Sequence, residues 1–386
     1  MELHLLPHHR FSAILAMSAA LPCATANVAS AATEMLPTEV ISAPADPDPR
    51  PTSLEPVYFG RVLALDGNRA LFASVTSSVA YIYTRGQDGW ESRARLVMPP
   101  GYRAGATAEL SGDTAVLGVQ DSSFTPSLLV FQRTQTGWAI VQTLPAGSVA
   151  RDGGNFAISD ATGIGLYERS AHGLRRQAHI DKPSDTVDFG SSFALDGDTL
   201  FVGAPFSGSN SQGNVYVYER HGQHWTLAQQ LDASDPQTSF GSAVDLKGRV
   251  AVVGAFAADR DPDSQVLMGA AYVFRKVGGT WHEEQKILNP TNGSFAAFVA
   301  GTDETHLYLS SHYIDNNHAM VFAYRRLHGD WSIERELVPP TASNNFALHY
   351  SIGRCTFLTG EAYVPTPDPV FDGEAYLYRL DGCHHH

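Results

Sequence analysis

The chain has 386 residues, of which 26 are Lys or Arg and 40 are Asp or Glu, so its formal charge at pH 7 is −14. So acidic a chain is a poor nucleic-acid binder, because phosphate binding requires a positive surface. Its hydrophobic fraction of 43% is enough to bury a core, which excludes wholesale disorder.

The N-terminus has the pattern of a secretory signal peptide. A weakly basic stretch (8–10) precedes an apolar run (11–21) that is too short to span a bilayer. Small residues in an A-x-A arrangement follow at 29–31, and also earlier at 24–26. We predict that residues 1–31 are a signal peptide cut near Ala31, with cleavage after Ala26 as the alternative.

The predicted destination is outside the cytoplasm, in the periplasm, on the cell surface or in the medium. A lipoprotein anchored through Cys23 is an alternative, although Pro22 stands where such signals place a small residue. No later stretch is long and apolar enough for an integral membrane segment.

One motif repeats seven times after the N-terminal segment. Its most regular landmark is the glycine of an early tight turn, at Gly67, Gly112, Gly153, Gly197, Gly248 and Gly353, with Asp303 at that place in the sixth copy. By subtraction, successive landmarks lie 41 to 55 residues apart. A period of this size is typical of propeller blades or solenoid repeats.

Each copy contains four strand-like runs, which we name a to d. In the copy 189–231, a short run a leads through the turn into run b, and run c places Tyr216 and Tyr218 on one face of a strand. Run d opens with tryptophan. All five tryptophans of the chain occupy this position: Trp90, Trp138, Trp225, Trp281 and Trp331. Leu174 replaces it in the third copy.

The ends of the chain distinguish a closed ring from an open solenoid. The seventh copy stops after run c, and residues 38–43 form a strand-like run before the first copy. We therefore predict an all-β fold, a seven-bladed β-propeller of four-stranded antiparallel blades, whose ring is closed by the N-terminal strand. The expected domains are the N-terminal segment 32–58, the propeller 59–383 and a His tail 384–386.

Specific residues resemble a known repeat. Phe189-Gly190 is followed by Gly203-Ala204-Pro205, and the next copy has Phe240-Gly241 followed by Gly254-Ala255. This pattern resembles the FG-GAP repeat of the integrin α-subunit propeller and of many bacterial secreted proteins. The resemblance covers roughly residues 59–380 and implies the propeller fold. It implies little about function, because this fold supports many unrelated roles.

Calcium binding is a separate question. Blades of the integrin type often carry an Asp-x-Asp-x-Asp-Gly loop between runs a and b, whereas this chain has only short turns such as Asp196-Gly197-Asp198. Another acidic cluster, Asp259, Asp261 and Asp263, lies between runs b and c. Alternate carboxylates can ligate calcium, so this cluster is a candidate metal site, with a solvated polar loop as the alternative. We predict no other cofactor.

Two cysteines remain after removal of the signal peptide. Antiparallel pairing of runs b and c in the last copy places Cys355 near Leu380, about three residues before Cys383. In an oxidising compartment these two cysteines are expected to form a disulfide that ties down the C-terminus.

The two faces of a propeller of this kind differ in their loops. The b–c and d–a loops emerge on what we call the long-loop face, and the a–b and c–d turns emerge on the short-turn face. The long loops are rich in aspartate: Asp181, Asp185, Asp188, Asp232, Asp235, Asp259, Asp261, Asp263, Asp315, Asp368 and Asp372. We therefore expect the long-loop face to be acidic.

The short-turn face is expected to carry a ring of basic residues. Every run c is followed by an arginine: Arg85, Arg133, Arg169, Arg220, Arg275, Arg325 and Arg379. These arginines either attract a partner or flank the hairpins and pair with acids such as Glu168 and Glu219.

No catalytic motif of the nucleophile-elbow, P-loop, H-E-x-x-H or C-x-x-C type is present in the sequence. We therefore expect an exported, monomeric, non-enzymatic binding or adhesion module whose long-loop face holds a protein or a cell-surface glycan. Two alternatives stay open. One is a hydrolase or lyase with an active site on the propeller axis, which requires carboxylates or histidines gathered there. The other is a structural component of the envelope.

Overall fold

The computed structural model describes residues 33–44, 59–75, 77–208, 211–235, 238–258, 269–290, 296–314, 318–340, 346–347, 349–361 and 373–380. The predicted signal peptide, the aspartates 259, 261 and 263, Cys383 and the His tail lie outside these residues. Within the described part of the chain, no helix is long and apolar enough to cross a membrane.

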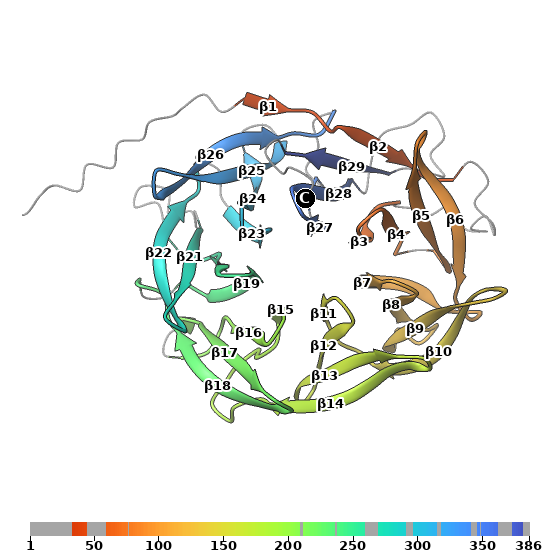
Figure 1. Ribbon diagram of the computed structural model, residues 1–386, viewed down its shortest axis with the longest axis horizontal. Helices are drawn as coiled ribbons and strands as arrows, with labels where there is room; N and C mark the ends of the chain where they lie inside the picture. The colour runs from red at the N-terminus through yellow and green to blue at the C-terminus, as the bar shows by residue number, and fades with distance from the viewer. Residues whose placement is uncertain are drawn as a thin grey trace, which may run out of the picture. The chain divides into compact units, whose positions relative to one another are not determined.

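The described residues form seven antiparallel sheets arranged in a ring (Figure 1). Blade 1 consists of β3 (Val62–Asp66), β4 (Arg69–Ala73), β5 (Val79–Gly86) and β6 (Gly89–Val97). Blade 2 consists of β7 (Arg103–Ser111), β8 (Thr114–Gln120), β9 (Pro126–Thr134) and β10 (Gly137–Pro145). Blade 3 consists of β11 (Val149–Asp152), β12 (Asn155–Asp160), β13 (Gly163–Ser170) and β14 (Gly173–Asp181).

Blade 4 consists of β15 (Ser192–Asp196), β16 (Thr199–Ala204), β17 (Asn214–His221) and β18 (His224–Leu231). Blade 5 consists of β19 (Phe240–Lys247), β20 (Val250–Ala255), β21 (Ala270–Val277) and β22 (Thr280–Leu288). Blade 6 consists of β23 (Ala296–Thr302), β24 (His306–Ile314), β25 (His318–Leu327) and β26 (Asp330–Leu337), with β1 (Thr33–Met35) as a fifth strand. Blade 7 consists of β27 (Tyr350–Gly353), β28 (Thr356–Glu361), β29 (Glu374–Arg379) and β2 (Glu39–Ser42).

Strand a of each blade lies next to the ring axis and strand d lies at the rim (Figure 1). The predicted seven-bladed fold is confirmed, and six turn landmarks fall between strands a and b of their blades, while Gly353 is the last residue of strand a in blade 7. Each tryptophan is the second residue of its strand d, as is Leu174 in blade 3.

The N-terminal strand closes the ring at the predicted place. Strand β2 pairs antiparallel with β29, with Ile41 opposite Ala375. The Glu39 carboxylate accepts hydrogen bonds from Arg85 of blade 1 at 3.0 Å and from Arg379 of blade 7 at 3.3 Å. Strand β1 was not predicted. It pairs in parallel with β26 of blade 6, so the N-terminal segment joins two blades.

The core of this ring lies between blades. The buried apolar residues fall into seven clusters, and each cluster is shared by two neighbouring blades, including the pair formed by blades 7 and 1. A single blade therefore cannot bury its own apolar faces. Stability depends on contacts between neighbours, as in other repeat proteins.

Candidate functional site

The residues of the repeat motif hold the blades together. Phe189 packs edge-on against Tyr216 of strand c in its own blade, with ring centroids 5.6 Å apart. Phe240 does the same with Tyr272 at 5.3 Å. Because the strand-c aromatics of these two blades are themselves buried, the motif phenylalanine adds to the apolar core there.

The motif glycines allow one blade to approach the next. A Cβ on Gly203, at the end of strand b, would come within 2.1 Å of the Gly241 carbonyl oxygen in the following blade. Gly190 and Gly241 also have positive φ angles of 82° and 90°, a backbone conformation that glycine adopts without penalty. Ala347 occupies the equivalent place in blade 7 and keeps a positive φ of 58°.

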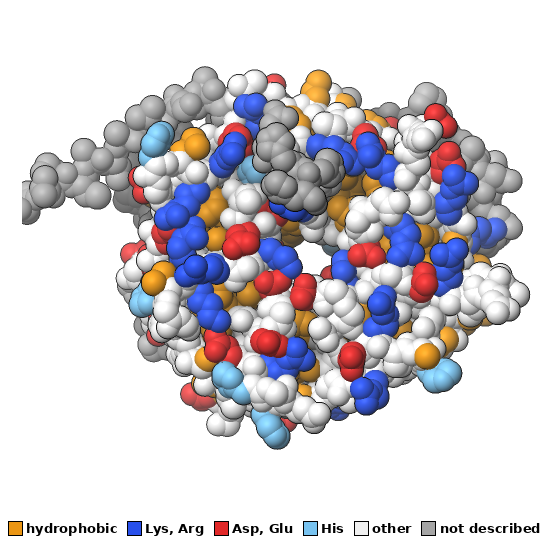
Figure 2. All heavy atoms as spheres, in the orientation of Figure 1, with side chains coloured by type: hydrophobic (Ala, Val, Ile, Leu, Met, Phe, Trp, Pro, Cys, Tyr) orange, Lys and Arg blue, Asp and Glu red, His pale blue; other side chains and the backbone are white. Residues whose placement is uncertain are grey.

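The seven arginines lie within the last three residues of each strand c, and most of them are paired with carboxylates. Arg85 and Arg379 pair with Glu39, Arg133 with Asp113, Arg220 with Asp198, Arg275 with Glu284, and Arg325 with Glu334. The two acids named as partners from the sequence bind other cations, since Glu168 pairs with Arg175 and Glu219 with Lys276. Figure 2 accordingly shows Lys and Arg side chains interspersed with Asp and Glu around the central hollow.

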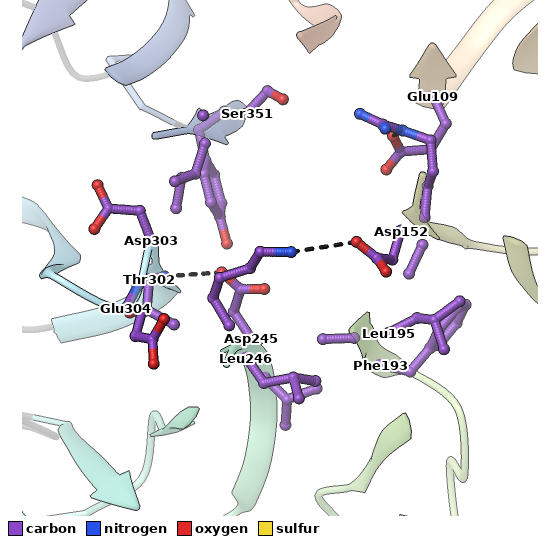
Figure 3. A pocket seen from close by; sticks show the side chains of 18 of the residues that line it. Glu109, Asp152, Phe193, Leu195, Asp245, Leu246, Thr302, Asp303, Glu304 and Ser351 are labelled. Atoms are coloured by element: carbon purple, nitrogen blue, oxygen red, sulfur yellow. Dashed lines mark hydrogen bonds and ion pairs between the residues drawn. The ribbon is translucent and has the colours of Figure 1, made fainter. Parts of the chain in front are cut away.

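A cavity of about 610 Å³ lies at the axis, where the ends of the strands a converge. Its polar lining comes from one or two residues of several blades, so no local stretch of sequence contains the site (Figure 3). Glu109, Asp152, Asp245 and Glu304 supply carboxylates, and Arg151, Lys247 and Arg354 supply positive charges. An active site on the propeller axis requires carboxylates or histidines gathered there, and these carboxylates lie near the axis.

Hydrogen bonds around this cavity form a continuous ring in which each blade reaches its successor. In each blade, one side chain near the a–b turn forms a hydrogen bond with the backbone of the next blade. The seven pairs, in chain order, are Asp66 Oδ2 and Gly112 N at 2.8 Å, Ser111 Oγ and Gly153 O at 2.5 Å, Asp152 Oδ2 and Gly197 N at 2.9 Å, Asp196 Oδ2 and Gly248 N at 2.7 Å, Asp245 Oδ2 and Thr302 N at 2.8 Å, Asp303 Oδ2 and Cys355 N at 2.7 Å, and Ser351 Oγ and Leu65 N at 3.0 Å. The aspartates of the a–b turns therefore bind neighbouring amides, which is a structural use of these acids.

Two basic side chains reach across an intervening blade. Arg151 of blade 3 contacts Glu109 of blade 2 at 3.2 Å and donates to the Leu65 carbonyl oxygen of blade 1 at 3.0 Å. Lys247 of blade 5 contacts Asp196 of blade 4 and, at 3.2 Å, Asp152 of blade 3. Both cations neutralise part of the acidic lining. Burial raises the pKa of Glu109, and the nearby Arg151 opposes that rise.

Asp245 is a second axial carboxylate whose pKa is raised by burial. Burial raises its pKa to about 7, even though the Thr302 and Leu246 amides donate to it and the charge of Lys247 favours ionisation. A carboxyl group with a pKa near the working pH is suited to general acid–base chemistry. Figure 3 shows Asp245 beside Thr302 at the wall of the cavity.

A buried histidine lies between two carboxylates beside the cavity. His306 Nδ1 lies 3.3 Å from Asp303 Oδ2, and Nε2 lies 3.3 Å from Glu334 Oε2. Burial raises the pKa of Asp303, but hydrogen bonds from His306 and Thr305 outweigh it and hold the pKa at about 2. Cys355 Sγ is near both Asp303 and His306. Because Cys355 is disulfide-bonded, its sulfur is no thiolate ligand, and we assign no metal to this group.

The structure describes Cys355 alone of the two cysteines in the predicted disulfide. Leu380 N donates to the Cys355 carbonyl oxygen at 3.0 Å, which is the register expected from the sequence. The pairing with Cys383 lies outside the described residues, as does the candidate calcium cluster at 259, 261 and 263. Both stay predictions.

The long-loop face carries an exposed apolar patch over blades 4 and 5. Val187 is 52% exposed and Phe206 is 40% exposed. The ring of Phe206 lies edge-on to Phe256, with centroids 6.1 Å apart. We call these three residues, of which Phe256 is half-buried, the blade 4/5 patch. Exposed aspartates lie next to it in the sequence or on the adjoining loop, at 185, 188 and 232.

One contact between blades was missed in the sequence. Gln229, four residues after Trp225, donates from Nε2 to the Trp281 carbonyl oxygen at 2.8 Å and accepts from the Trp281 amide at 2.9 Å. Gln285 makes the same pair with Trp331, and Gln142 makes it with Leu174. The signal was present in the sequence, as a glutamine four residues after tryptophan in three copies.

Comparison with known proteins identifies the repeat directly. The family model described as FG-GAP repeat matches residues 183–218 and 225–274. These residues run from the loop before β15 to β21. No curated protein sequence matches the chain.

Solved structures agree at the level of the fold. A chain of the Mitotic Checkpoint Complex has a TM-score of 0.54 and 10% identity, and the match covers 89% of this chain and 94% of that one. A putative 6-phosphogluconolactonase from Bacteroides uniformis has a TM-score of 0.52, 12% identity and coverages of 72% and 85%. The periplasmic gluconolactonase of Pseudomonas aeruginosa has a TM-score of 0.50, 15% identity and coverages of 74% and 86%. At such identities these similarities concern the fold alone.

Proposed function

The chain carries FG-GAP repeats on a seven-bladed β-propeller, and from this premise we propose that it is an exported, non-enzymatic module that binds a protein partner at its long-loop face. The observation that carries the proposal is the blade 4/5 patch. Contiguous exposed apolar side chains on a rigid scaffold mark interaction sites. The patch also lies within the part of the chain that matches the FG-GAP family model.

The patch is held in place before any partner arrives. The hydroxyl of Ser207, itself only 2% exposed, accepts from Val187 N at 2.8 Å and donates to Val187 O at 3.1 Å. Ala257 N donates to the Thr238 carbonyl oxygen at 3.1 Å, which fixes the neighbouring loop. A preorganised surface loses less conformational entropy on binding, so more of the contact energy appears as affinity.

Charge next to the patch selects the kind of partner. Asp185, Asp188 and Asp232 are exposed, and Asp232 accepts hydrogen bonds from the amides of Asn214 and Gln230. An apolar centre beside carboxylates suits a protein segment in which Lys or Arg flanks a large apolar side chain.

The test uses synthetic peptides of defined composition and fluorescence anisotropy. Peptides with Leu or Phe flanked by Lys are expected to bind, with weaker binding at high salt, and peptides flanked by Glu are not. The double variant Val187→Ser with Phe206→Ser is expected to lose binding. Phe124→Ser is the matched control, because Phe124 is 77% exposed on the b–c loop of blade 2.

Two outcomes count against the proposal. Unchanged peptide binding in the double variant would show that the peptides bind somewhere other than the blade 4/5 patch. Binding to a glycan array that depends on Phe206, together with no peptide binding, replaces the protein partner by a glycan.

The axial cavity supports a second candidate function, a hydrolase. The specific observation is Asp245, a carboxyl group with a pKa of about 7 in a cavity of about 610 Å³ lined by further carboxylates. Such a group is able to activate water as a general base. Hydrolysis of any member of a lactone and glycan panel, lost in Asp245→Asn with the melting temperature retained, would support this function. No turnover across the panel would leave the binding module as the proposal.

A further inference from the structure

A second cavity, of about 460 Å³, lies on the short-turn face where blades 1, 2 and 3 meet. Its lining includes Arg69 from blade 1, Asp113, Thr114 and Gln132 from blade 2, and Arg169 and Ser170 from blade 3. It is separate from the axial cavity and from the blade 4/5 patch.

Arg169 differs from the other arginines that follow strand c. The other six lie within ion-pair distance of a carboxylate, and among the described residues Arg169 has none. Its Nη1 donates to the Ser111 carbonyl oxygen at 2.9 Å. The guanidinium lies directly over Gly112, since a Cβ there would come within 2.2 Å of Nη1. Within the described part of the chain, no carboxylate therefore forms an ion pair with Arg169.

The cavity also contains two buried oxygens without partners. Thr114 and Gln132 lie opposite each other on strands β8 and β9, so their side chains share one face of the blade. Thr114 Oγ1 and Gln132 Oε1 are both buried and accept or donate no hydrogen bond among the described residues. Gln132 Nε2 donates to the Ser170 carbonyl oxygen at 3.1 Å, which fixes the orientation of the amide.

Unpaired buried polar atoms are costly, and each requires an explanation. Gln132 Oε1 only accepts hydrogen bonds, so its partner must be a donor such as a hydroxyl group. The Asp113 carboxylate in the lining also only accepts hydrogen bonds, and it already lies near Arg69 and Arg133. Asp113 also weakens the attraction for an anion whose oxygens only accept, because such an anion brings like charge to it without a compensating hydrogen bond.

Arg169 has no carboxylate partner among the described residues and favours an anionic group, and the acceptor oxygens favour hydroxyl groups. We propose that this cavity binds a sugar acid, whose carboxylate pairs with Arg169 and whose hydroxyls bond Thr114, Gln132 and Asp113. Arg69, which is shared between Asp66 and Asp113 at 3.5 Å each, lies beside the carboxylate. Because neither Thr114 Oγ1 nor Gln132 Oε1 is open to solvent, the proposal requires the side chains that cover these oxygens to move when the ligand enters.

Calorimetric titration of the whole protein at low ionic strength tests the proposal, with glucuronate as the probe. Glucuronate is expected to bind, and glucose and sulfate to bind at least about tenfold more weakly, because each lacks one of the two required features. Arg169→Ala is expected to weaken glucuronate binding by about tenfold or more. Arg220→Ala is the matched control: Arg220 takes the same place in blade 4 and pairs with Asp198.

A second variant separates binding from folding. Thr114→Val keeps the shape of the side chain and removes a hydroxyl that has no partner, so the melting temperature is expected to stay the same or to rise, while glucuronate binding weakens. Equal glucuronate affinity in Arg169→Ala and the wild type overturns the proposal. So does sulfate binding as tight as that of glucuronate, which identifies a site for bare anions, and so does Thr114→Val lowering the melting temperature without affecting glucuronate.

Discussion

Gly360 in the last blade lies against Gly60 in the first, so closely that a Cβ on Gly360 would come within 1.9 Å of the Gly60 carbonyl oxygen. Gly203 and Gly241 stand in the same relation between blades 4 and 5, at 2.1 Å. In both pairs, a glycine near the end of strand b of one blade contacts a glycine near the start of strand a of the next. The ring closes with the contact that it also uses between its inner blades.

Replacing Gly360 by alanine is expected to destabilise the protein by about 1–3 kcal/mol or more, because the added methyl meets backbone that cannot move aside. Gly154→Ala is the control, since the nearest atom to a Cβ there lies at 3.8 Å. Thermal denaturation measures both. Equal melting temperatures for the two variants would show that the seam tolerates a side chain.

The closing strand makes a measurable contribution to stability. Ile41, which is 2% exposed, packs into the core between blades 7 and 1. Ile41→Ala is expected to cost about 2–5 kcal/mol, whereas the neighbouring Val40→Ala, at a position 48% exposed, is expected to cost far less. Deletion of residues 32–58 should lower the melting temperature sharply. An unchanged melting temperature after this deletion would contradict closure by the N-terminal strand.

The glutamine contact between blades is open to a direct test. Gln229→Ala leaves the amide and the carbonyl of Trp281 without their partners, and this tryptophan is 2% exposed. The expected loss is about 1–3 kcal/mol, because buried backbone groups are left unpaired. The exposed neighbour Gln230 is the control. Chemical denaturation that gives the same midpoint for both variants would mean that water replaces the lost bonds.

Asp245 makes stability depend on pH in an unusual direction. Its pKa is raised from 3.8 to about 7 in the folded chain, so the folded state holds a proton that the unfolded state has released. Stability from this group is fully present below about pH 4 and is lost as the pH rises to 7, by at most about 4 kcal/mol. Asp245→Asn should remove this decline. Denaturation midpoints recorded across the range would show it, and parallel profiles for the two proteins would contradict the assignment.

The sequence predicted the fold because the information was repeated. Turn glycines such as Gly197 and the tryptophan at the second residue of strand d mark the same place in most copies, so their spacing gave the number of blades. Strand β1 carried no such mark. Its three residues pair in parallel with β26. A segment of three residues is too short to show the alternation of apolar and polar residues that indicates a strand.

The axial site was beyond sequence reasoning for a geometric reason. Its side chains come from the ends of inner strands that are far apart in the chain. They also differ in charge from blade to blade, being acidic at Asp152 and basic at Lys247. Only the closed ring brings them together. The blade 4/5 patch depends likewise on the Ser207 hydroxyl holding Val187 from another loop. The sequence placed recognition on the long-loop face but did not single out these residues.

The pairing of β2 with β29 also sets an order of events during synthesis. Thr38 and Leu377, which share a hydrogen bond, are 339 positions apart. At about 5–20 residues per second, the ribosome delivers the first partner on the order of a minute or less before the second. Throughout that interval the apolar face of Ile41 and the edge of blade 1 are uncovered. The N-terminal strand is thus synthesised early but pairs last. A chain that stops before its final blade leaves these apolar surfaces exposed to association with other molecules.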